Sequence, residues 1–567
     1  MKMIQRIALI LAPSEKGISK YGYTYLPPLS LGVLGGYLSD KNYDVSLYDL
    51  NMKLPDIYQN EEQFAFLYDK ETILNYLNNK EDHRVAMLAS SLLEDIPIEE
   101  MDIIGISCGA DFSFFQLHSA FLLGKYIQKK YHIPVILGGN NITYLTLFQD
   151  TFHELLLLLL DSFPYIIKGP GEVVLSELLD ILNGNSQHNP YDLDGMVYRK
   201  DGKIHTNREH PPIVTRPNWC NLPMEYYYLK INHIKDTSSD KAIARMEAEN
   251  RMHVFKWPFF LTHYVSVVRK QLQDEDNHEF TDKLVLPYIF NYHCPYSCAF
   301  CSESDTERKE VILGEVNKVV EDILWLTNTY HTNYFYFLNN AANASAKFID
   351  EFCRQLIERQ IHIVWSDCAR FNNMTYERLK LMKEAGCCKL VFGFETASQK
   401  LITLVEKKID LSQAVQVMEW CKELGIWTDL EVIIGLPQEN EEDFLDTVKF
   451  VTDNKQYINY MTINEFFVVP NSKIGRNPKK YGIELVRNVI DYDKILKRSW
   501  NYFKDKKGKQ TGNFKIYKFN EINGRKFNEI MKDTKEHIRK MNDLQNKEFA
   551  EVEGVYRILE KRISARH

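Results

Sequence analysis

The sequence has no excess of basic residues and no apolar run long enough to cross a membrane. Its 567 residues include 69 Lys and Arg against 77 Asp and Glu, a formal net charge of −8. Nucleic-acid binding proteins usually carry a basic footprint, so we expect no nucleic-acid partner. The richest apolar stretch, residues 155–160, has six leucines. A membrane span needs about 20 residues, so we expect none.

The sequence also lacks the marks of secretion. Its apolar start is interrupted by Gln5 and Arg6 and is too short for the core of a signal peptide. Of ten cysteines, only three form a recognisable pattern. This usage fits a reducing cytosol better than a disulfide framework. We therefore expect a cytoplasmic protein.

The three patterned cysteines are Cys294, Cys298 and Cys301, within C-P-Y-S-C-A-F-C, directly after the apolar run 284–290. Three thiolates fall one short of the four that an iron–sulfur cluster normally takes. A [4Fe–4S] cluster bound here would keep one iron open to a small molecule. A closed zinc site would need a fourth ligand at short spacing, and His293 is poorly placed to supply it. The remaining interpretation is three buried free thiols.

This motif, with the aromatic Phe300 before its last cysteine, resembles the signature of the radical S-adenosylmethionine (radical SAM) superfamily. The resemblance implies that the open iron binds the amino and carboxylate groups of S-adenosylmethionine. An electron from a donor such as flavodoxin or ferredoxin then cleaves the sulfonium to methionine and a 5′-deoxyadenosyl radical. That radical takes a hydrogen atom from an unactivated carbon. The cofactors carry the chemistry, while the protein orients them and excludes water.

The first two hundred residues alternate apolar strands with helical patterns, which predicts a parallel α/β domain. Glycines follow several strands, at the edge where open α/β sheets bind ligands. The predicted strands are residues 6–11, 44–48, 103–107, 135–137 and 165–167. The predicted helices are residues 29–38, 114–130 and 172–182.

The glycine-containing segments resemble the cobalamin-binding domain that precedes many radical SAM domains, over roughly residues 3–215. A hairpin-like stretch at 194–202 fits the end of that module. The resemblance implies a Rossmann-like domain that binds cobalamin. No D-x-H-x-x-G motif is present, so no histidine is offered as the lower axial ligand of cobalt. The alternative is a degenerate domain that binds nothing. The implied contacts are Ser107, Cys108, Gly138, Gly139, Gly169 and Glu172.

From residue 284 the alternation of strands and helices resumes and resembles the partial (β/α)6 barrel of radical SAM enzymes. Four parts are predicted: a Rossmann-like domain (1–215), a linker with a helical insertion (216–283), the barrel (284–485) and a helical C-terminal cap (486–567). Within the cap, a helical pattern covers 519–562. The predicted barrel strands are residues 285–290, 334–338, 363–366, 389–394, 428–434 and 460–469.

Functional side chains are expected at the carboxyl ends of the barrel strands. By resemblance to radical SAM segments, Asn339 lies near the methionine amino group of the cofactor. Arg370 would reach its carboxylate or ribose, and a guanidinium suits bidentate carboxylate binding. Glu395 and Ser398, in G-F-E-T-A-S, would contact the methionine or ribose part, and Gly435 the adenine side. The alternative for Arg370 is a surface salt bridge.

Together these resemblances imply a cobalamin-dependent radical SAM C-methyltransferase that acts on a small molecule or a peptide. Two alternatives stay open. One is a cobalamin-assisted rearrangement, cyclisation or oxidation without methyl transfer. The other is a sensor that binds cobalamin or the cluster without turnover. Formation of S-adenosylhomocysteine separates methyl transfer from the first alternative, and cleavage of S-adenosylmethionine separates an enzyme from the second.

Overall fold

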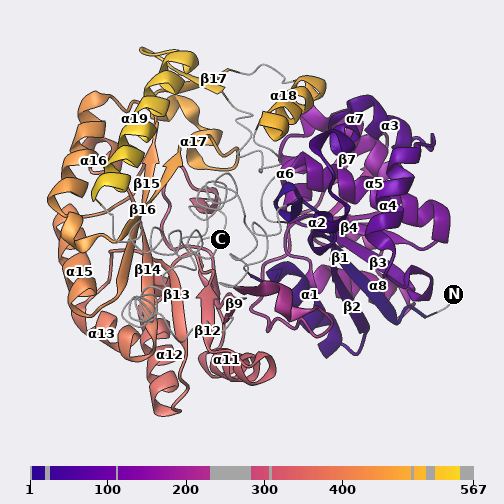
Figure 1. Cartoon of the computed structure of the whole chain (residues 1–567), viewed down its shortest axis with the longest axis horizontal. Coiled ribbons are helices and arrows are strands. Elements are labelled where there is room, and N and C mark those ends of the chain that lie inside the picture. Colours follow the sequence, from indigo (N-terminus) through magenta and orange to yellow (C-terminus); the bar gives the residue numbers. More distant parts are fainter. Residues whose placement is uncertain are drawn as a thin grey trace, which may run out of the picture. The chain divides into compact units, whose positions relative to one another are not determined.

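Two structural units make up the chain (Figure 1). Unit 1 comprises residues 1–227 and 488–514, and unit 2 comprises residues 228–487 and 515–567. The computed structural model describes residues 3–18, 26–109, 113–229, 283–304, 310–486, 491–505 and 518–548. The helical insertion is predicted within residues 216–283. Of these, residues 230–282 lie outside the described part of the chain. Among the described helices, none combines the length and the apolar character that a membrane crossing requires.

Unit 1 contains a seven-stranded sheet in the order β2-β1-β3-β4-β5-β6-β7. Its first five strands are parallel, and β6 and β7 form an antiparallel hairpin. The parallel order 2-1-3-4-5 is that of the flavodoxin-like doubly wound fold, which binds ligands at the carboxyl ends of β1 and β3. The predicted α/β fold and its five strands are confirmed. The bounds are β1 Arg6–Leu11, β2 Asp44–Asp49, β3 Ile103–Ser107, β4 Val135–Gly138, β5 Tyr165–Ile167, β6 Met196–Lys200 and β7 Lys203–Thr206.

Helices cover this sheet, including a group between β2 and β3 that the sequence analysis did not identify. That group packs with α5 and with α18 (Tyr492–Asp505) into one apolar core. His118 of α5 bonds the Leu67 carbonyl and the Tyr492 hydroxyl. Burial lowers the pKa of His118 to about 4. The helices are α1 Leu29–Asp40, α2 Leu54–Ile57, α3 Lys70–Leu77, α4 His83–Leu93, α5 Phe114–Tyr131, α6 Asn140–Leu147, α7 Gln149–Ser162 and α8 Glu172–Leu182.

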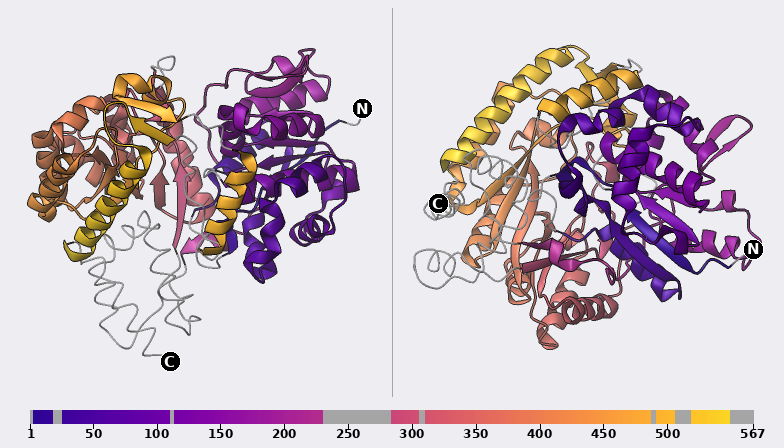
Figure 2. Two further views of the ribbon diagram at one scale, coloured as in Figure 1. Left: turned by 90° about the horizontal axis from the view of Figure 1, so that it is seen from above. Right: turned by 45° about the vertical axis from the view of Figure 1, so that its right-hand side comes forward.

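Unit 2 contains a second seven-stranded sheet, in the order β16-β15-β14-β13-β12-β9-β8. Its six long strands are parallel, as the predicted partial barrel requires, and β8 pairs antiparallel with β9. The helices α12, α13, α15 and α16 lie along one face of this sheet (Figures 1 and 2). The strands are β8 Tyr228–Leu229, β9 Lys283–Tyr288, β12 Tyr334–Phe337, β13 Val364–Ala369, β14 Cys387–Glu395, β15 Trp427–Ile434 and β16 Tyr460–Glu465. The helices are α11 Val316–Tyr330, α12 Ala346–Glu358, α13 Tyr376–Glu384, α14 Gln399–Leu404, α15 Leu411–Glu423, α16 Glu441–Asp453 and α17 Lys473–Arg476.

In the C-terminal region, the observed structure differs from one prediction made from the sequence. The sequence predicts a helix over 519–562, but Lys518–Glu521 forms β18, antiparallel to β17 (Ile483–Val486). Alternate residues of β18 are buried, which is the period of a strand. Helix α19 (Phe527–Glu548) follows, and residues beyond 548 lie outside the described part.

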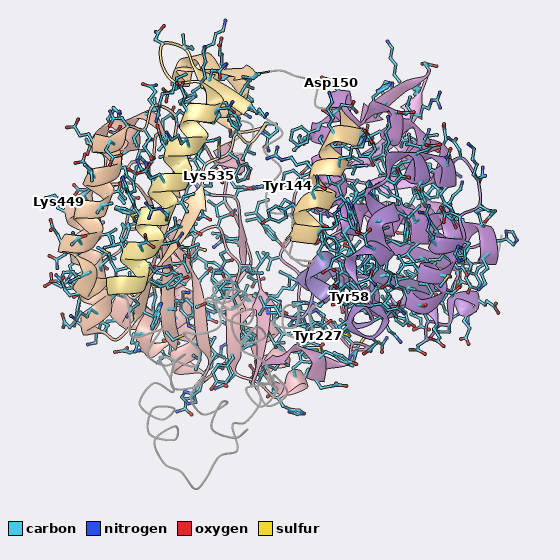
Figure 3. All side chains as sticks on the ribbon, turned by 45° about the horizontal axis from the view of Figure 1, so that its top comes forward. Tyr58, Tyr144, Asp150, Tyr227, Lys449 and Lys535 are labelled. Atoms are coloured by element: carbon cyan, nitrogen blue, oxygen red, sulfur yellow. The ribbon has the colours of Figure 1, made fainter. Side chains whose placement is uncertain are left out.

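Helix α19 covers the free edge of the barrel sheet. Its buried residues Ile530, Thr534, His537 and Met541 recur at helical spacing, while Lys535 is exposed (Figure 3). The Gln545 amide accepts from the Met461 N–H (2.7 Å) and donates to the Met461 carbonyl (2.9 Å). A side chain thus pairs with backbone groups that an edge strand would otherwise expose.

A buried ion pair joins two central strands of unit 2. Lys389 Nζ on β14 lies 3.0 Å from Asp429 Oδ2 on β15, and both side chains are 0% exposed. Burial raises the pKa of Asp429, and the neighbouring Lys389 acts against that shift. Each charge therefore depends on the other to remain in the interior.

Lys389→Met should lower the free energy of unfolding by about 3–5 kcal/mol, because Asp429 would lose its buried partner. The double variant Lys389→Met/Asp429→Leu should recover most of this loss, since no charge remains to be desolvated. Lys449, whose ion pair with Asp453 is exposed, provides the control, and Lys449→Met should cost less than about 1 kcal/mol. Urea denaturation measures all three, and a double variant as unstable as the single one would contradict this account.

Candidate active site

The three cysteines of the motif lie together in the connection that follows β9. Cys298 is buried, and Cys294 and Cys301 are partly buried. Burial raises the pKa of Cys294 and of Cys301, the latter to about 12, and the charges of the neighbouring thiols add to both shifts. The three sulfur atoms are therefore close enough to act on one another. This donor set fits a cluster in which each of three irons takes one thiolate.

No group of three His, Cys, Asp or Glu side chains among the described residues is arranged to hold a single metal ion. His293 has a different partner, because its Nδ1 lies 3.0 Å from Glu303 Oε2. The residue has a positive φ of 63°, and the chain turns there into the cysteine loop. His293 is thus engaged with a carboxylate at the start of this loop.

Distant segments of unit 2 hold the backbone of the cysteine loop. The Ala299 N–H donates to the Val405 carbonyl (2.8 Å), and the Ala299 carbonyl accepts from the Ile474 N–H (3.0 Å). Lys473 Nζ donates to the Ser297 carbonyl (2.8 Å). The loop is thus tied to the segments that follow α14 and β16.

The segment after α14 has an unusual backbone. Glu406 and Lys408 both adopt positive φ, 55° and 54°, which costs energy in residues other than glycine. Glu406 accepts hydrogen bonds from Lys473, Lys480 and Tyr481. Burial opposes the Glu406 charge, but these donors outweigh it and lower the pKa of Glu406 to about 2. The ionised carboxylate therefore holds the turn in place.

Two buried cations lie beside the cysteines. Arg370 Nη1 donates to Cys298 Sγ (3.4 Å), Nη2 donates to the Lys407 carbonyl (2.6 Å), and the guanidinium stacks 3.9 Å from the centre of the Tyr296 ring. Lys407 Nζ lies 2.6 Å from Glu395 Oε1, with both side chains 5% exposed. The sequence predicts a cofactor-binding role for Arg370, which stays a prediction, and it gave no signal for Lys407.

Asn339 is part of the scaffold beneath the cysteine loop. Its Oδ1 accepts from the N–H groups of Phe290 and Asn291 (both 2.9 Å), and its Nδ2 donates to Asp367 Oδ2 (2.5 Å). Burial raises the pKa of Asp367 to about 8, against the hydrogen bonds from Asn339 and Cys368. The polar atoms of Asn339 are thus committed to the protein, and its predicted contact with S-adenosylmethionine remains a prediction.

Glu395 is the last residue of β14, and Ser398 follows it three residues later. Glu395 has a positive φ of 71° at a register shift with β15, and a Cβ added at Gly393 would lie 2.7 Å from Lys407 Nζ. Glycine at 393 is what lets Lys407 reach Glu395. The Ser398 hydroxyl donates to Asp443 (2.6 Å) and caps α14. Phe300 lies 5.7 Å from Lys407 Nζ, measured to the ring centre.

Gly435 directly follows β15 and has a positive φ of 87°. Its N–H donates to Glu439 Oε2 (3.1 Å), and the other oxygen of Glu439 lies 3.4 Å from His537 Nδ1 of α19. His537 Nε2 bonds Glu441 (2.8 Å), and its ring stacks on Phe444 at 3.9 Å. Burial disfavours the imidazolium, but the two carboxylates outweigh it and raise the pKa of His537. Helix α19 thus holds the segment predicted to face adenine.

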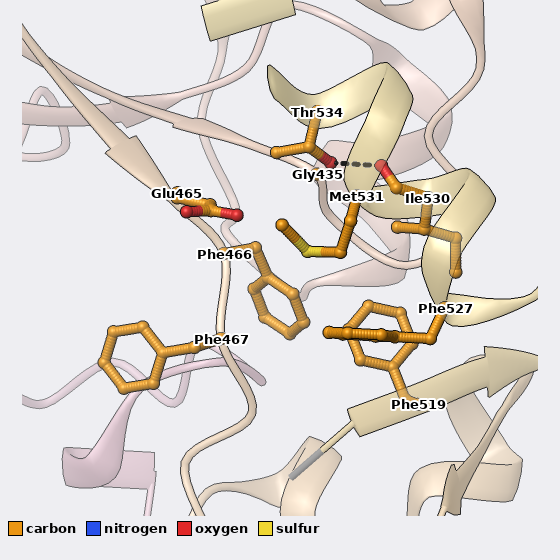
Figure 4. A pocket seen from close by; sticks show the side chains of 9 residues that line it. All are labelled: Gly435, Glu465, Phe466, Phe467, Phe519, Phe527, Ile530, Met531 and Thr534. Atoms are coloured by element: carbon orange, nitrogen blue, oxygen red, sulfur yellow. Dashed lines mark hydrogen bonds between the residues drawn. The ribbon is translucent and has the colours of Figure 1, made fainter. Parts of the chain in front are cut away.

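A small cavity adjoins Gly435 between the end of β16 and α19 (Figure 4). Its volume is about 10 Å³, room for roughly one water molecule. It is therefore too small for an adenine ring. The lining residues are Gly435, Glu465, Phe466, Phe467, Phe519, Phe527, Ile530, Met531 and Thr534.

In unit 1 the residues predicted to contact cobalamin lie at the carboxyl ends of β3, β4 and β5. Ser107 ends β3, Cys108 follows it, and the Cys108 N–H donates to the Gly138 carbonyl (2.8 Å). A Cβ at Gly139 would lie 2.3 Å from the Cys108 carbonyl oxygen, so glycine is required there. Burial raises the pKa of Cys108 to about 12, which keeps it a neutral thiol.

The other two predicted residues follow β5. Gly169 adopts a positive φ of 73°, and its N–H donates to Thr143 Oγ1 (2.9 Å) on α6. Glu172 begins α8, and burial raises its pKa. Because β5 pairs with β4, these residues share one edge of the sheet with Gly138 and Gly139.

Asn141, which the sequence analysis did not single out, has an unused acceptor at this edge. It is 0% exposed, and its Nδ2 donates to Gln116 Oε1 (3.1 Å). Its Oδ1 is buried without a hydrogen-bond partner in the described part of the chain. A buried acceptor of this kind normally has a donor, and the primary amides of cobalamin are donors. The edge therefore fits the predicted cofactor.

Residues 288–451 match the family model of the radical SAM superfamily. The chain therefore carries a radical SAM domain. This match confirms the radical SAM domain inferred from the cysteine motif and marks the chain as an enzyme. The matched region begins at the last residue of β9 and ends within α16, so it spans most of the barrel sheet.

Two curated relatives extend the comparison beyond the radical SAM domain. The chain is 22% identical over 452 residues to a Pyrococcus horikoshii protein named uncharacterized methyltransferase PH0819, covering 79% of this chain and 78% of that one. It is 28% identical over 297 residues to the anaerobic magnesium-protoporphyrin IX monomethyl ester cyclase of Rubrivivax gelatinosus, covering 51% of this chain and 44% of the cyclase.

Two solved structures share the fold. The methyltransferase TsrM from Kitasatospora setae superposes with a TM-score of 0.55 at 14% identity, covering 86% of this chain and 81% of TsrM. The cobalamin-dependent radical enzyme OxsB superposes with a TM-score of 0.51 at 15% identity, covering 91% of this chain and 57% of OxsB. At these identities the likeness concerns the fold, and it confirms the predicted fold class.

Asn339→Ala should destabilise unit 2, because the buried N–H groups of Phe290 and Asn291 would lose their acceptor at about 1–3 kcal/mol each. Urea denaturation measures this loss. Asn317→Ala is the matched control, since that side chain makes an exposed contact with Arg359. Equal stability of the two variants would show that Asn339 does not support the loop.

His537→Gln should cost more stability at pH 6 than at pH 9. Because the folded pKa of His537 is raised above its ordinary value, its contribution is complete below a pH of about 6.5. That contribution is lost as the pH rises through the folded value. Urea unfolding of both proteins at the two pH values tests this, and an equal cost at both would contradict it.

Proposed function

We propose that the chain is a cobalamin-dependent radical SAM methyltransferase that transfers a methyl group to an unactivated carbon. The observation that carries the proposal is the loop of Cys294, Cys298 and Cys301, in which three thiols lie together at a barrel-strand end beside Arg370 and Lys407. These thiols would hold a [4Fe–4S] cluster with one iron open.

When bound, the cluster and S-adenosylmethionine supply a 5′-deoxyadenosyl radical, and cobalamin supplies the methyl group. The chain's own residues bind and orient these groups. Glu395, at the end of β14, would accept hydrogen bonds from the ammonium or ribose of S-adenosylmethionine. The backbone at Gly435 would face its adenine, with Glu439 and His537 fixing that turn.

The proposal that cobalamin binds is based on the residues at the carboxyl edge of the sheet in unit 1. Gly138, Gly139 and Gly169 would let the cofactor approach the backbone, and Asn141 Oδ1 would accept from one of its amides. The solved structures of TsrM and OxsB hold cobalamin, and TsrM is a methyltransferase, which supports the same assignment.

A second candidate is a cyclisation or other cobalamin-assisted reaction without methyl transfer. The resemblance to the Rubrivivax gelatinosus cyclase favours it, at 28% identity over half of this chain. Methyl transfer is the first choice because the methyltransferase TsrM shares the fold over 86% of this chain and a relative named a methyltransferase covers 79% of it. For either reaction we propose a flavodoxin or ferredoxin as electron donor, a small molecule or peptide as substrate, and a cytoplasmic location.

The proposal is tested by anaerobic preparation with cobalamin supplied, followed by measurement of iron, sulfide and corrinoid. Cys298→Ala should abolish the cluster absorbance and leave corrinoid bound. Asn141→Leu should lower corrinoid content and leave iron unchanged. Cys220→Ala, which removes an exposed thiol of unit 1, is the control and should retain both.

Turnover separates the candidate reactions. With dithionite the reconstituted protein should cleave S-adenosylmethionine to 5′-deoxyadenosine, and Cys298→Ala should not. Formation of S-adenosylhomocysteine as well would indicate methyl transfer. A preparation without iron and inorganic sulfide, or one that never cleaves S-adenosylmethionine, would overturn the proposed function.

A further inference from the structure

Arg370 makes a direct hydrogen bond to one of the cluster cysteines. Its Nη1 lies 3.4 Å from Cys298 Sγ, within the range of an N–H···S bond. The arginine is 7% exposed and Cys298 is 6% exposed, so little water competes for either group. The bond therefore acts in an environment of low dielectric, where such contacts are strong.

The position of the guanidinium is fixed from several sides. Its Nη2 donates to the Lys407 carbonyl (2.6 Å), and its plane stacks on Tyr296, which belongs to the cysteine loop. The Arg370 backbone exchanges two hydrogen bonds with the Asn343 amide (3.0 and 2.8 Å). The charge is thus pre-organised toward Cys298.

The positive charge of the second cation, Lys407, is paired with the carboxylate of Glu395. Its Nζ lies 2.6 Å from Glu395 Oε1, and both groups are buried. Both Arg370 and Lys407 act electrostatically on Cys294 as well. Around the cysteines, Arg370 therefore contributes a positive charge with no carboxylate of the described residues bonded to it, whereas Glu395 offsets part of the charge of Lys407.

We propose that Arg370 sets the reduction potential of the iron–sulfur cluster, raising it through the N–H···S bond to Cys298 and its buried positive charge, while Glu395 limits the effect of Lys407. Reduction adds a negative charge to the cluster, and hydrogen bonds to the sulfurs and nearby positive charge stabilise that state. The inference rests on the cluster of the proposed function, and it assigns Arg370 a positioning and tuning role there.

The test is a redox titration of the cluster, followed by electron paramagnetic resonance without S-adenosylmethionine. Arg370→Met should shift the ratio of reduced to oxidised cluster at fixed potential at least tenfold toward the oxidised form, a fall in midpoint of about 59 mV for one electron. Glu395→Gln should shift the midpoint upward, because Lys407 loses its counter-charge.

Two further variants separate tuning from a loss of structure. Arg378→Met removes a part-buried arginine paired with Asp350 in the same unit and should leave the midpoint unchanged. Arg370→Lys retains the positive charge but lacks the two guanidinium nitrogens that bond Cys298 and the Lys407 carbonyl at the same time. Its midpoint should fall between those of the wild type and Arg370→Met.

Wild-type protein that binds no iron and sulfide would overturn the proposed function rather than this inference alone. If the wild type holds a cluster and an iron-replete Arg370 variant has an unchanged midpoint, the inference is wrong. If neither Arg370 variant retains iron, Glu395→Gln decides, and an unchanged or lowered midpoint in it overturns the inference.

Discussion

The hydrogen bonds between the cysteine loop and the turn after α14 are the constraint on which the rest of unit 2 depends. Residues 293–301 contain no helix or strand, so the positions of the three thiols are imposed from outside. The Ala299 N–H reaches the Val405 carbonyl, and Arg370 reaches both Cys298 and the Lys407 carbonyl. One turn therefore fixes the loop and its neighbouring arginine together.

That turn is stable only because its charges are matched. Positive φ at Glu406 and Lys408 is unfavourable, and burial of Lys407 and Glu395 would be costly for either alone. Glu406 has three donors, and Lys407 has Glu395. The unfavourable backbone conformation is therefore offset by the bonds that Glu406 makes with the segment after β16 and by the pair between Lys407 and the end of β14.

The sequence predicts the elements of the fold better than the contacts of the site. Both sheets follow from apolar runs, because buried parallel strands read as continuous apolar segments. The C-x3-C-x2-C spacing is local, so the sequence alone predicts a cluster-binding loop there. Lys407 could not be found in this way, since its function depends on a turn more than a hundred residues from the cysteines. Asn339 and Ser398 were recognised by motif, but the structure commits their side chains to backbone and capping contacts.

The C-terminal region shows the same limit at the level of whole units. Helical periodicity there predicts one cap, but α18 packs in the core of unit 1, while β18 and α19 belong to unit 2. Periodicity indicates that a helix has an apolar face, but it does not indicate against which core that face packs. Tyr492 bonds His118, and His537 bonds Glu439, so the two helices complete separate polar networks. Neither unit is therefore a continuous segment, and removal of the chain after residue 486 would take a core helix from both.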